Sequence, residues 1–204
     1  MKVRKRETPE LRKNQIIAAA DLVLLEVGID RFTVDQVIEK AGIAKGTVYN
    51  YYKNKDEMLA ELGAKAIRLL YESFKEATSK TDSYVDKVKS ICYSHYDYTK
   101  RYPAYSDLIS HMERPEFDLH IQKYIKISYG ITDFIVNMIK EGQKVGEIKQ
   151  DIDPHVLTYI SWASNVGVVQ FLESKKNMLK NHHEISTQQM VETFADMITE
   201  GIRN

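Results

Sequence analysis

The apolar positions of this chain recur every three or four residues, which is the period of an α-helix and not that of a strand. Val34, Val37, Ile38 and Ala41 show the pattern clearly, because they fall on one face of a helix. No stretch alternates between apolar and polar residues over a length that would predict a strand. The sequence therefore predicts an all-α fold of about nine helices.

Capping residues and helix breakers set the expected bounds of these helices. Thr8 and Asp153 each precede a proline that can occupy the first helical position, and Ser186 can cap the last helix. The polar stretch from Ser174 to Ile185 is expected to be a loop. The expected helices cover residues 9–27, 34–41, a short segment from about 44, 54–78, 81–101, 103–112, 116–141, a segment from 154, and 186–202.

Residues 33–55 predict two short helices around a tight turn. Thr33 can cap the first helix while Gln36 returns a hydrogen bond to the cap, and Gly42 ends the helix. A second helix follows from about Ala44 and is anchored by Val48. The spacing and the glycine favour a helix-turn-helix, in which the second helix enters the major groove of DNA.

The outward face of this second helix carries hydrogen-bond donors and one cation but no acid. Thr47, Tyr49 and Asn50 can donate to phosphate oxygens and to base edges, and Lys45 adds a positive charge. Lys55 stands at the start of the next expected helix, where exposed N–H groups attract phosphate. These residues are therefore candidates for contact with double-stranded DNA.

The run from Ala41 to Tyr52, AGIAKGTVYNYY, followed by NKDE and Leu59, resembles the DNA-binding signature of the TetR family of bacterial transcriptional repressors. The resemblance covers roughly the first third of the chain. Two positions depart from it: Ala44 stands where the family often has a capping residue, and Asp35 stands where it often has a basic one. The resemblance implies DNA-binding residues at Thr33, Lys45, Gly46, Thr47, Tyr49, Asn50, Tyr51 and Lys55.

The chain has no net charge, but its charges are unevenly distributed. Residues 1–55 carry a net charge of +4, and the remaining residues carry −4. This places the basic end of the protein at the predicted helix-turn-helix. The basic segment 1–7 is expected either to be a solvated terminus or to contact the minor groove or the backbone of DNA.

Cysteine usage and hydropathy bear on the compartment. Cys92 is the only cysteine, which excludes a disulfide within the chain, fits a reducing compartment and predicts a core residue. No run approaches the roughly 18 apolar residues of a membrane-spanning helix, and no signal-type apolar core follows the basic start. We therefore expect a cytoplasmic protein with no membrane partner.

The helices expected between residues 81 and 141 are rich in tyrosine, and the family resemblance implies an effector pocket in this region. Tyrosine offers an apolar ring and one hydroxyl, a mixture typical of pockets for small, mostly apolar or aromatic molecules. The alternative is that each tyrosine lies in the core or on the surface. The candidate ligand-binding residues are Tyr93, Tyr96, Tyr105, His111, Met112, Tyr124, Tyr129 and Trp162.

The helix from residue 154 is apolar on more than one side, so one of its faces must be covered by another element. The family resemblance implies that the last two helices pair with their copies in a second subunit as a four-helix bundle. Burial within one subunit is the plainer alternative. The candidate homodimer residues are Tyr159, Ala163, Val166, Gly167, Gln170, Phe194, Met197 and Ile198.

The chain offers little support for an enzyme. His111, Glu113 and the segment 116–120 supply acid–base residue types, but no nucleophile motif, phosphate loop, HExxH motif or cysteine cluster accompanies them. The segment 182–184 (HHE) could bind a metal, yet such residues on a polar loop are more often solvated. We therefore expect no catalytic residues, no metal site and no cofactor.

Together these patterns predict a DNA-binding head over residues 1–53 and a helical effector-binding and dimerisation body over residues 54–204. The resemblance implies a ligand-responsive transcriptional regulator, a repressor that binds a palindromic operator as a homodimer and is released by a small effector. The alternative is a helical small-molecule-binding or interaction module whose head has lost DNA recognition, which Asp35 and Ala44 support.

Overall fold

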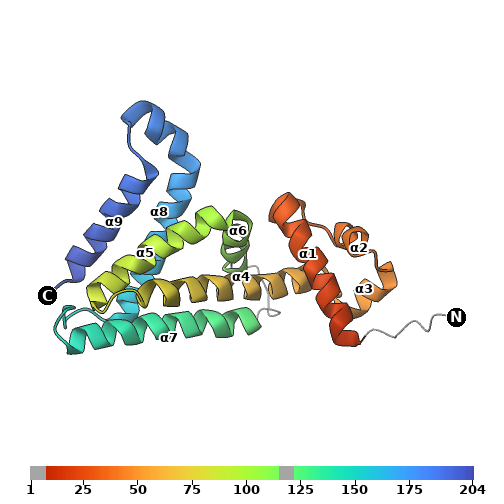
Figure 1. The fold of residues 1–204 in the computed structure, drawn as a ribbon, viewed down its shortest axis with the longest axis horizontal. Coiled ribbons are helices and arrows are strands. Elements are labelled where there is room, and N and C mark those ends of the chain that lie inside the picture. Colours follow the sequence, from red (N-terminus) through yellow and green to blue (C-terminus); the bar gives the residue numbers. More distant parts are fainter. Residues whose placement is uncertain (1–7, 115–121) are drawn as a thin grey trace. The chain divides into compact units, whose positions relative to one another are not determined.

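The computed structural model of the protein describes residues 8–114 and 122–204. Within these ranges the chain forms nine α-helices, and the one extended pairing is an isolated β-bridge between Ile148 and Arg203. The all-α prediction is confirmed. The helices, shown in Figure 1, are α1 (Pro9–Arg31), α2 (Val34–Ala41), α3 (Lys45–Tyr51), α4 (Lys55–Thr78), α5 (Tyr84–Arg101), α6 (Pro103–Met112), α7 (Gln122–Lys144), α8 (Pro154–His183) and α9 (Thr187–Ile202).

Local signals at both ends determine the bounds of α1. The Thr8 hydroxyl accepts a hydrogen bond from the backbone N–H of Leu11 at 3.3 Å, and Pro9 occupies the first turn as predicted. Gly28 has φ +73° and kinks the helix next to its predicted end, but the helical segment continues to Arg31. Only glycine adopts this backbone conformation at little cost.

Helix α7 ends later than predicted, because Gly142 lies inside the helix instead of ending it. The predicted start at Glu116 falls outside the described residues, and the described helix runs from Gln122 to Lys144. A Cβ atom at Gly142 would come within 2.6 Å of Ile148 Cδ1 and 2.7 Å of Tyr84 Cβ. The glycine therefore permits close packing of α7 against the start of α5.

Helix α8 is longer than predicted, and the loop expected at Ser174–Ile185 is wrong for its first ten residues. The helix continues to His183, and Glu184 with φ +55° caps it. Leu172 and Leu179 lie two turns apart on one face, and both are buried in a cluster with residues of α5 and α9. This apolar contact stabilises helix in a segment whose other residues are mostly polar.

Contacts within the chain divide it into two compact units. One comprises the described residues of Met1–Ile67 and Ala104–Ile125, and the other those of Arg68–Pro103 and Lys126–Asn204. Helix α4 contributes residues to both units. The boundary predicted between residues 53 and 54 is not tested by this grouping and stays a prediction.

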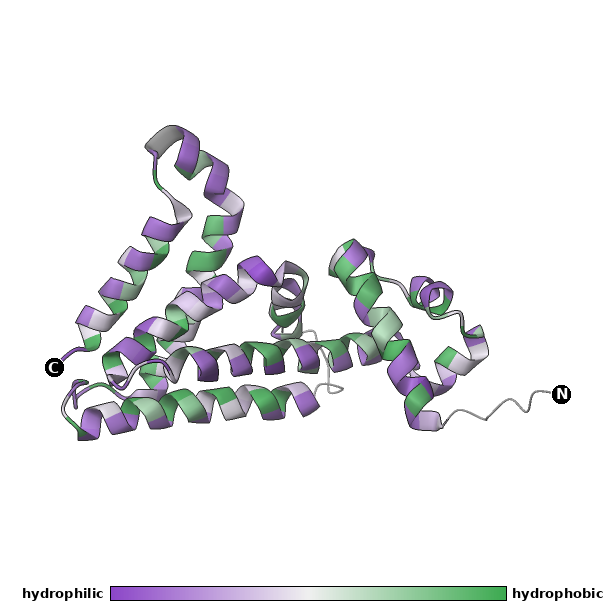
Figure 2. Cartoon of the chain, viewed as in Figure 1, coloured by the Kyte–Doolittle hydropathy of each residue, from purple (hydrophilic) through white to green (hydrophobic). Residues whose placement is uncertain are grey.

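Each unit has its own apolar core. Figure 2 shows apolar and polar residues sharing the turns of α4 and α7, as amphipathic helices require. Among the described helices, none is both long and apolar enough to cross a bilayer. The first core includes Ile16, Ala20, Leu24, Val37, Val48, Leu59 and Leu62, and the second includes Leu70, Phe74, Ile91, Ile135, Ile139 and Leu172.

The packing at Gly142 predicts that Gly142→Ala destabilises the protein. The added methyl group would press on Ile148 and Tyr84, and such overpacking costs about 1–3 kcal/mol. Gly201→Ala in α9 is the matched control, because nothing lies within 4 Å of its Cβ position and helix propensity should add about 0.5–1 kcal/mol. Chemical denaturation followed by circular dichroism checks both, and equal unfolding free energies for the two variants would contradict this account.

Candidate nucleic-acid interface and ligand cavity

Helices α2 and α3 form the predicted helix-turn-helix, and local hydrogen bonds fix its turn. The Thr33 backbone N–H donates to Gln36 Oε1 at 2.9 Å, while the Gln36 backbone N–H donates to the Thr33 hydroxyl at 3.3 Å. Gly42 ends α2 in the left-handed conformation with φ +63°, and its N–H donates to the carbonyls of Ile38 and Glu39. The predicted capping box and glycine stop are both present.

The inner side of α3 is anchored in the first unit. Val48 is fully buried, and so is nearly all of Tyr52, which follows the helix. The Tyr52 hydroxyl donates to Glu61 Oε2 at 2.9 Å, and Lys13 Nζ lies 2.9 Å from the same oxygen. Burial, reinforced by Glu61, raises the pKa of Tyr52 well above its usual value, so the phenol stays protonated and donates.

The outer side of α3 presents four of the eight predicted DNA-contacting residues to solvent. Lys45, Gly46, Tyr49 and Asn50 are exposed, whereas Thr47 is half-buried. Tyr51 and Lys55 are also half-buried, and Thr33 is exposed at the start of α2. The structure therefore brings these side chains to one region of the first unit, and their contact with DNA stays a prediction.

Two details of this surface differ from the prediction of a face that carries only hydrogen-bond donors and a free cation. Ala44 offers no side-chain hydrogen bond at the start of α3, where the backbone N–H of Thr47 donates to the Ala44 carbonyl at 2.8 Å. Lys45 Nζ donates to Asp35 Oδ1 at 3.0 Å, and both side chains are largely exposed. This hydrogen bond and the charge of Asp35 raise the pKa of Lys45. Asp35 therefore competes with phosphate for the lysine.

Lys55 is placed differently from the expectation of a phosphate-facing cation. Its ammonium donates to the backbone carbonyl of Ile29 at 3.0 Å and lies 5.9 Å from the centre of the Phe32 ring. An ammonium has three donors, so a phosphate contact is compatible with this bond but must share the group. Lys55 thus connects the start of α4 to the end of α1 in the same unit.

Comparison with known proteins identifies the family of this helix-turn-helix. A family model described as "Bacterial regulatory proteins, tetR family" matches residues 16–62, which include α2, α3 and the start of α4. A relative matches along nearly the whole chain: the fatty acid metabolism regulator protein of Bacillus subtilis (strain 168) is 23% identical over 191 residues, 93% of this chain and 95% of the relative. Residues 16–62 therefore form a DNA-binding domain of the TetR family.

Solved structures share the fold of this protein along its length. A protein of unknown function from Rhodococcus sp. RHA1 has a TM-score of 0.80 at 14% identity, with complete coverage of both chains. FadR from Bacillus subtilis, solved in complex with stearoyl-CoA, has a TM-score of 0.71 at 21% identity, with 93% of this chain and 99% of that chain covered. These likenesses show the fold alone. The family match shows a DNA-binding transcriptional regulator, and its relatives are regulators and not enzymes.

The predicted ligand-binding residues do not converge on one site. Tyr105, His111, Met112 and Tyr124 lie in the first unit. The Tyr105 hydroxyl donates there to Asp21 Oδ1 at 2.7 Å. Such contacts brace helices of the first unit.

The other four candidates lie in the second unit but are also dispersed. Tyr129 is 65% exposed, and Tyr93 is half-buried. Tyr96 packs in the cluster between α5, α8 and α9, and its hydroxyl donates to Thr187 Oγ1 at 2.7 Å. Trp162 is the candidate that lines the buried cavity of this unit. The ligand-binding role of all eight residues stays a prediction.

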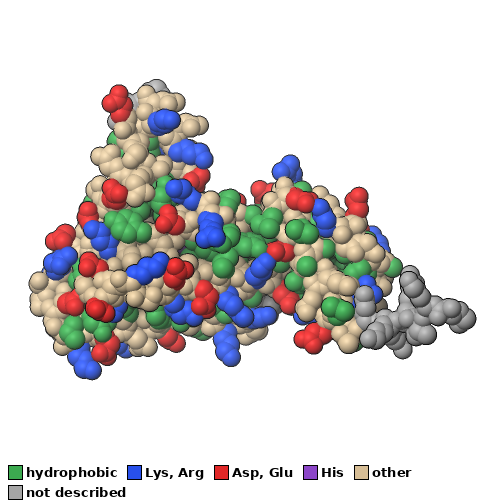
Figure 3. Space-filling model, viewed as in Figure 1, with side chains coloured by type: hydrophobic (Ala, Val, Ile, Leu, Met, Phe, Trp, Pro, Cys, Tyr) green, Lys and Arg blue, Asp and Glu red, His purple; other side chains and the backbone are tan. Residues whose placement is uncertain are grey.

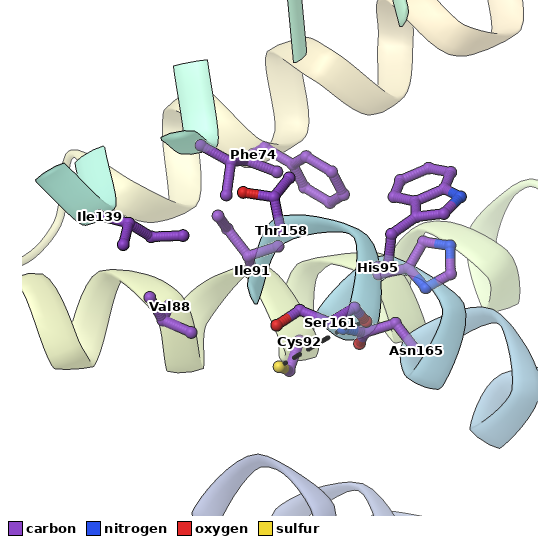
Figure 4. A pocket seen from close by; sticks show the side chains of 11 residues that line it. Phe74, Val88, Ile91, Cys92, His95, Ile139, Thr158, Ser161 and Asn165 are labelled. Carbon is purple, nitrogen blue, oxygen red and sulfur yellow. Dashed lines mark hydrogen bonds between the residues drawn. The ribbon is translucent and has the colours of Figure 1, made fainter. Parts of the chain in front are cut away.

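This cavity lies among α4, α5, α7 and α8 and holds about 20 Å³ of free volume. Figure 4 shows its wall, to which α5 and α8 contribute the most residues. Phe74 and Trp162 meet edge to face in it, with ring centroids 6.5 Å apart. The lining residues are Phe74, Val88, Ile91, Cys92, His95, Ile135, Ile139, Thr158, Ser161, Trp162 and Asn165.

Most polar groups of the cavity wall are already hydrogen-bonded, but two are not. The Thr158 hydroxyl donates to the Pro154 carbonyl at 2.7 Å. The Asn165 amide donates to the Ser161 carbonyl at 2.8 Å and to Cys92 Sγ at 3.6 Å, the contact dashed in Figure 4. His95 Nδ1 and Ser161 Oγ have no partner within the described residues. Burial lowers the pKa of His95 to about 4 and raises that of Cys92.

The predicted homodimer residues lie at the surface of α8 and α9. Tyr159 is 56% exposed and Met197 70% exposed, and Ala163, Gly167 and Gln170 are exposed as well. Val166, Phe194 and Ile198 are half-buried. Further apolar side chains extend the same helix surface. They are Val156, Ile160 and Phe171.

On the face that Figure 3 shows, charged side chains do not gather into one large patch. Lys and Arg lie interspersed there with Asp and Glu, in keeping with a net charge of zero. Within the described residues, no group of three His, Cys, Asp or Glu side chains is arranged to hold a metal ion. The segment 182–184 was the sequence candidate for a metal, and the side chains of residues 182 and 183 lie outside the described structure.

The ion pair between α2 and α3 predicts that Asp35→Asn binds duplex DNA more tightly than the natural protein. The substitution removes an acid and releases Lys45, which can then neutralise one more phosphate. We expect about two- to ten-fold higher affinity at low salt, and a slope of log affinity against log salt that is steeper by about 1. Fluorescence anisotropy over a salt series measures both, with Glu39→Gln on α2 as a control for charge alone. Equal gains in the two variants would reject the role of the pair.

The buried imidazole predicts a pH dependence of stability. In the unfolded chain a histidine binds a proton near pH 6.5, whereas folded His95 does so only near pH 4. The unfolded state therefore binds more protons in this window, and stability falls as the pH drops from 7 to 4, by about 3 kcal/mol from this group. His95→Gln should remove this part of the slope, and His155→Gln at an exposed site should not. Urea unfolding by circular dichroism at fixed protein concentration measures the difference, and parallel slopes for all three proteins would refute it.

Proposed function

We propose that this TetR-family regulator is a ligand-responsive repressor, which binds a palindromic operator as a homodimer and leaves it when a small, mostly apolar effector binds. The observation that supports this most directly is the exposed outer side of α3, held outward by the burial of Val48. A rigid short helix with free donors on one side fits the major groove.

Operator recognition is assigned to the outer side of α3. Thr47, Tyr49 and Asn50 contact backbone and base edges, while Lys45 contributes a phosphate contact once it leaves Asp35. If about six phosphates are neutralised per head, the slope of log affinity against log salt is roughly −5 per head. Base contacts from α3 then supply the sequence preference.

The second subunit is assigned to the exposed apolar surface of α8 and α9. A monomer would leave Tyr159, Ile160 and Met197 more than half exposed. Such contiguous apolar surface marks an interface in soluble proteins. Ala163 and Gly167 are small and let a partner helix approach closely. Two-fold symmetry would match two half-sites of a palindrome.

The effector is assigned to the second unit, where the cavity has a mostly apolar wall. Because the FadR structure with the same fold carries stearoyl-CoA, we propose acyl-bearing molecules as the first effector class to examine. Phe74 places α4 in the cavity wall, and α4 begins at Lys55, four residues after α3. A ligand that displaces Phe74 can therefore act on the helix that leads to the head, with a coupling of about 1–3 kcal/mol.

A second candidate function is an interaction or small-molecule-binding module without sequence-specific DNA binding. The Asp35–Lys45 pair and the missing side-chain cap at Ala44 favour it, since both weaken a phosphate-binding surface. In that case binding to duplex DNA would be weak and indifferent to sequence.

Disruption of the α8–α9 surface tests the dimer and the repressor together. Ala163→Glu places a charge where two copies of α8 are proposed to meet, and we expect the dimer dissociation constant to rise by at least about 100-fold. Asn137→Glu adds the same charge to an exposed position of α7 and should leave the dimer intact. Sedimentation equilibrium measures the assembly, and gel shifts on genomic fragments selected by the natural protein measure operator binding.

The outcomes separate the candidate functions. The repressor proposal expects palindromic fragments, bound by the natural protein and by Asn137→Glu but lost with Ala163→Glu. Selection of fragments with no shared motif would favour the second candidate. An Ala163→Glu protein that remains a dimer would contradict the assignment of the interface, whether or not it still binds the operator.

A further inference from the structure

The cavity of the second unit has a mostly apolar wall, and this restricts which molecules it can bind. Its side chains are mainly aliphatic and aromatic, and the described lining includes no Lys, Arg, Asp or Glu. Moving an ion out of water into such surroundings is costly unless a counter-charge waits there. The wall therefore rejects a carboxylate or an ammonium group.

Histidine does not supply that counter-charge. His95 is 7% exposed, and burial lowers its pKa to about 4, so the imidazole is neutral near pH 7. A neutral imidazole carries one donor and one acceptor nitrogen. His95 can therefore serve an uncharged hydroxyl or carbonyl but gives an anion no charge compensation.

Two polar atoms of this wall have no hydrogen-bond partner within the described residues, and each can bind a polar group of an occupant. They are His95 Nδ1 on α5 and Ser161 Oγ on α8. Thr158 and Asn165 are already committed to backbone carbonyls. Buried polar atoms are normally paired, so an unpaired couple in a cavity indicates a missing partner.

A single water molecule is the simplest partner, but it would use only the polar part of the wall. The free volume of about 20 Å³ accommodates about one water. With two open polar atoms, such a water would make about two hydrogen bonds, the low end of the range for buried waters, and its other surroundings would be apolar. A molecule with one polar group and an apolar body would use both kinds of wall, after Phe74 and Trp162 move apart.

We infer that this cavity binds an uncharged, mostly aliphatic or aromatic molecule through one carbonyl or hydroxyl group, which His95 and Ser161 hold. The inference rests on the proposed function, because it specifies the effector of the same protein. It implies that an acyl group enters as a neutral thioester, ester, ketone or alcohol, and that the free fatty acid is excluded. Ser161 and His95 select the polar group, and the aliphatic wall selects the body.

Probes of equal carbon number, one neutral and one charged in each pair, test this inference. Isothermal titration calorimetry at pH 7.5 compares 2-hexanone, 2-octanone and 2-decanone with hexanoate, octanoate and decanoate on the full chain. At least one ketone should bind about ten-fold more tightly than the carboxylate of the same length. Nitrogen NMR signals of the His95 imidazole should shift with the ketone, which a site elsewhere would not cause.

Variants at Ser161 give the second arm. Ser161→Ala removes one hydrogen bond and should weaken ketone binding about three- to ten-fold. Ser164→Ala is the control, because Ser164 lies on the same helix but does not line the cavity. His95→Gln, if it folds, should weaken the ketone similarly.

Three results would overturn the inference. They are carboxylates that bind as tightly as ketones, equal affinities in Ser161→Ala and Ser164→Ala, and no binding of any ketone, which would leave a water as the only occupant. Operator gel shifts in the same samples keep the two proposals apart. Ketone binding without any change in operator affinity would contradict ligand control but would leave the inference about the cavity intact. A carboxylate that changes operator affinity would support ligand control but would contradict the inference about the cavity.

Discussion

The burial of one side of α3 is the constraint on which the DNA-binding surface depends. A seven-residue helix is too short to be stable alone in water, so its conformation must come from tertiary contacts. Val48 in the core, and the Tyr52 hydroxyl on Glu61, supply those contacts within one unit. Because these anchors act on the inner side only, Tyr49 and Asn50 remain exposed on a backbone that cannot easily rotate.

The cations of this surface are less available to phosphate than the net positive charge of residues 1–55 suggests. Residues 1–55 carry +4, yet Lys45 is paired with Asp35 and Lys55 with a backbone carbonyl. Cations held by local partners add less to general attraction for phosphate, while uncharged donors keep their ability to read base edges. The surface therefore favours discrimination between sequences over tight general binding.

Local signals in the sequence predicted the ends of several helices, but they did not predict which side chains from different helices meet. The Thr33 capping box, the stop at Gly42 and the cap at Ser186 were predictable, because each depends on residues within one turn. Of the predicted ligand-binding residues, only Trp162 lines the cavity, because a helix face alone does not say which side chains of different helices meet. Val88, Cys92 and His95 do share one face of α5, at spacings of four and three residues, and that signal could have located it.

Helix α8 serves two surfaces, and this explains why its sequence is apolar on more than one side. Thr158, Ser161 and Asn165 face the cavity, and Tyr159 and Ala163 lie exposed between them along the chain. With the proposed second subunit in place, α8 would be packed on both sides, and close-packed interiors transmit strain because they are hardly compressible. An occupant of the cavity and a second subunit would therefore act on the same helix. Each could then alter the affinity of the other without any direct contact, as reciprocal coupling requires.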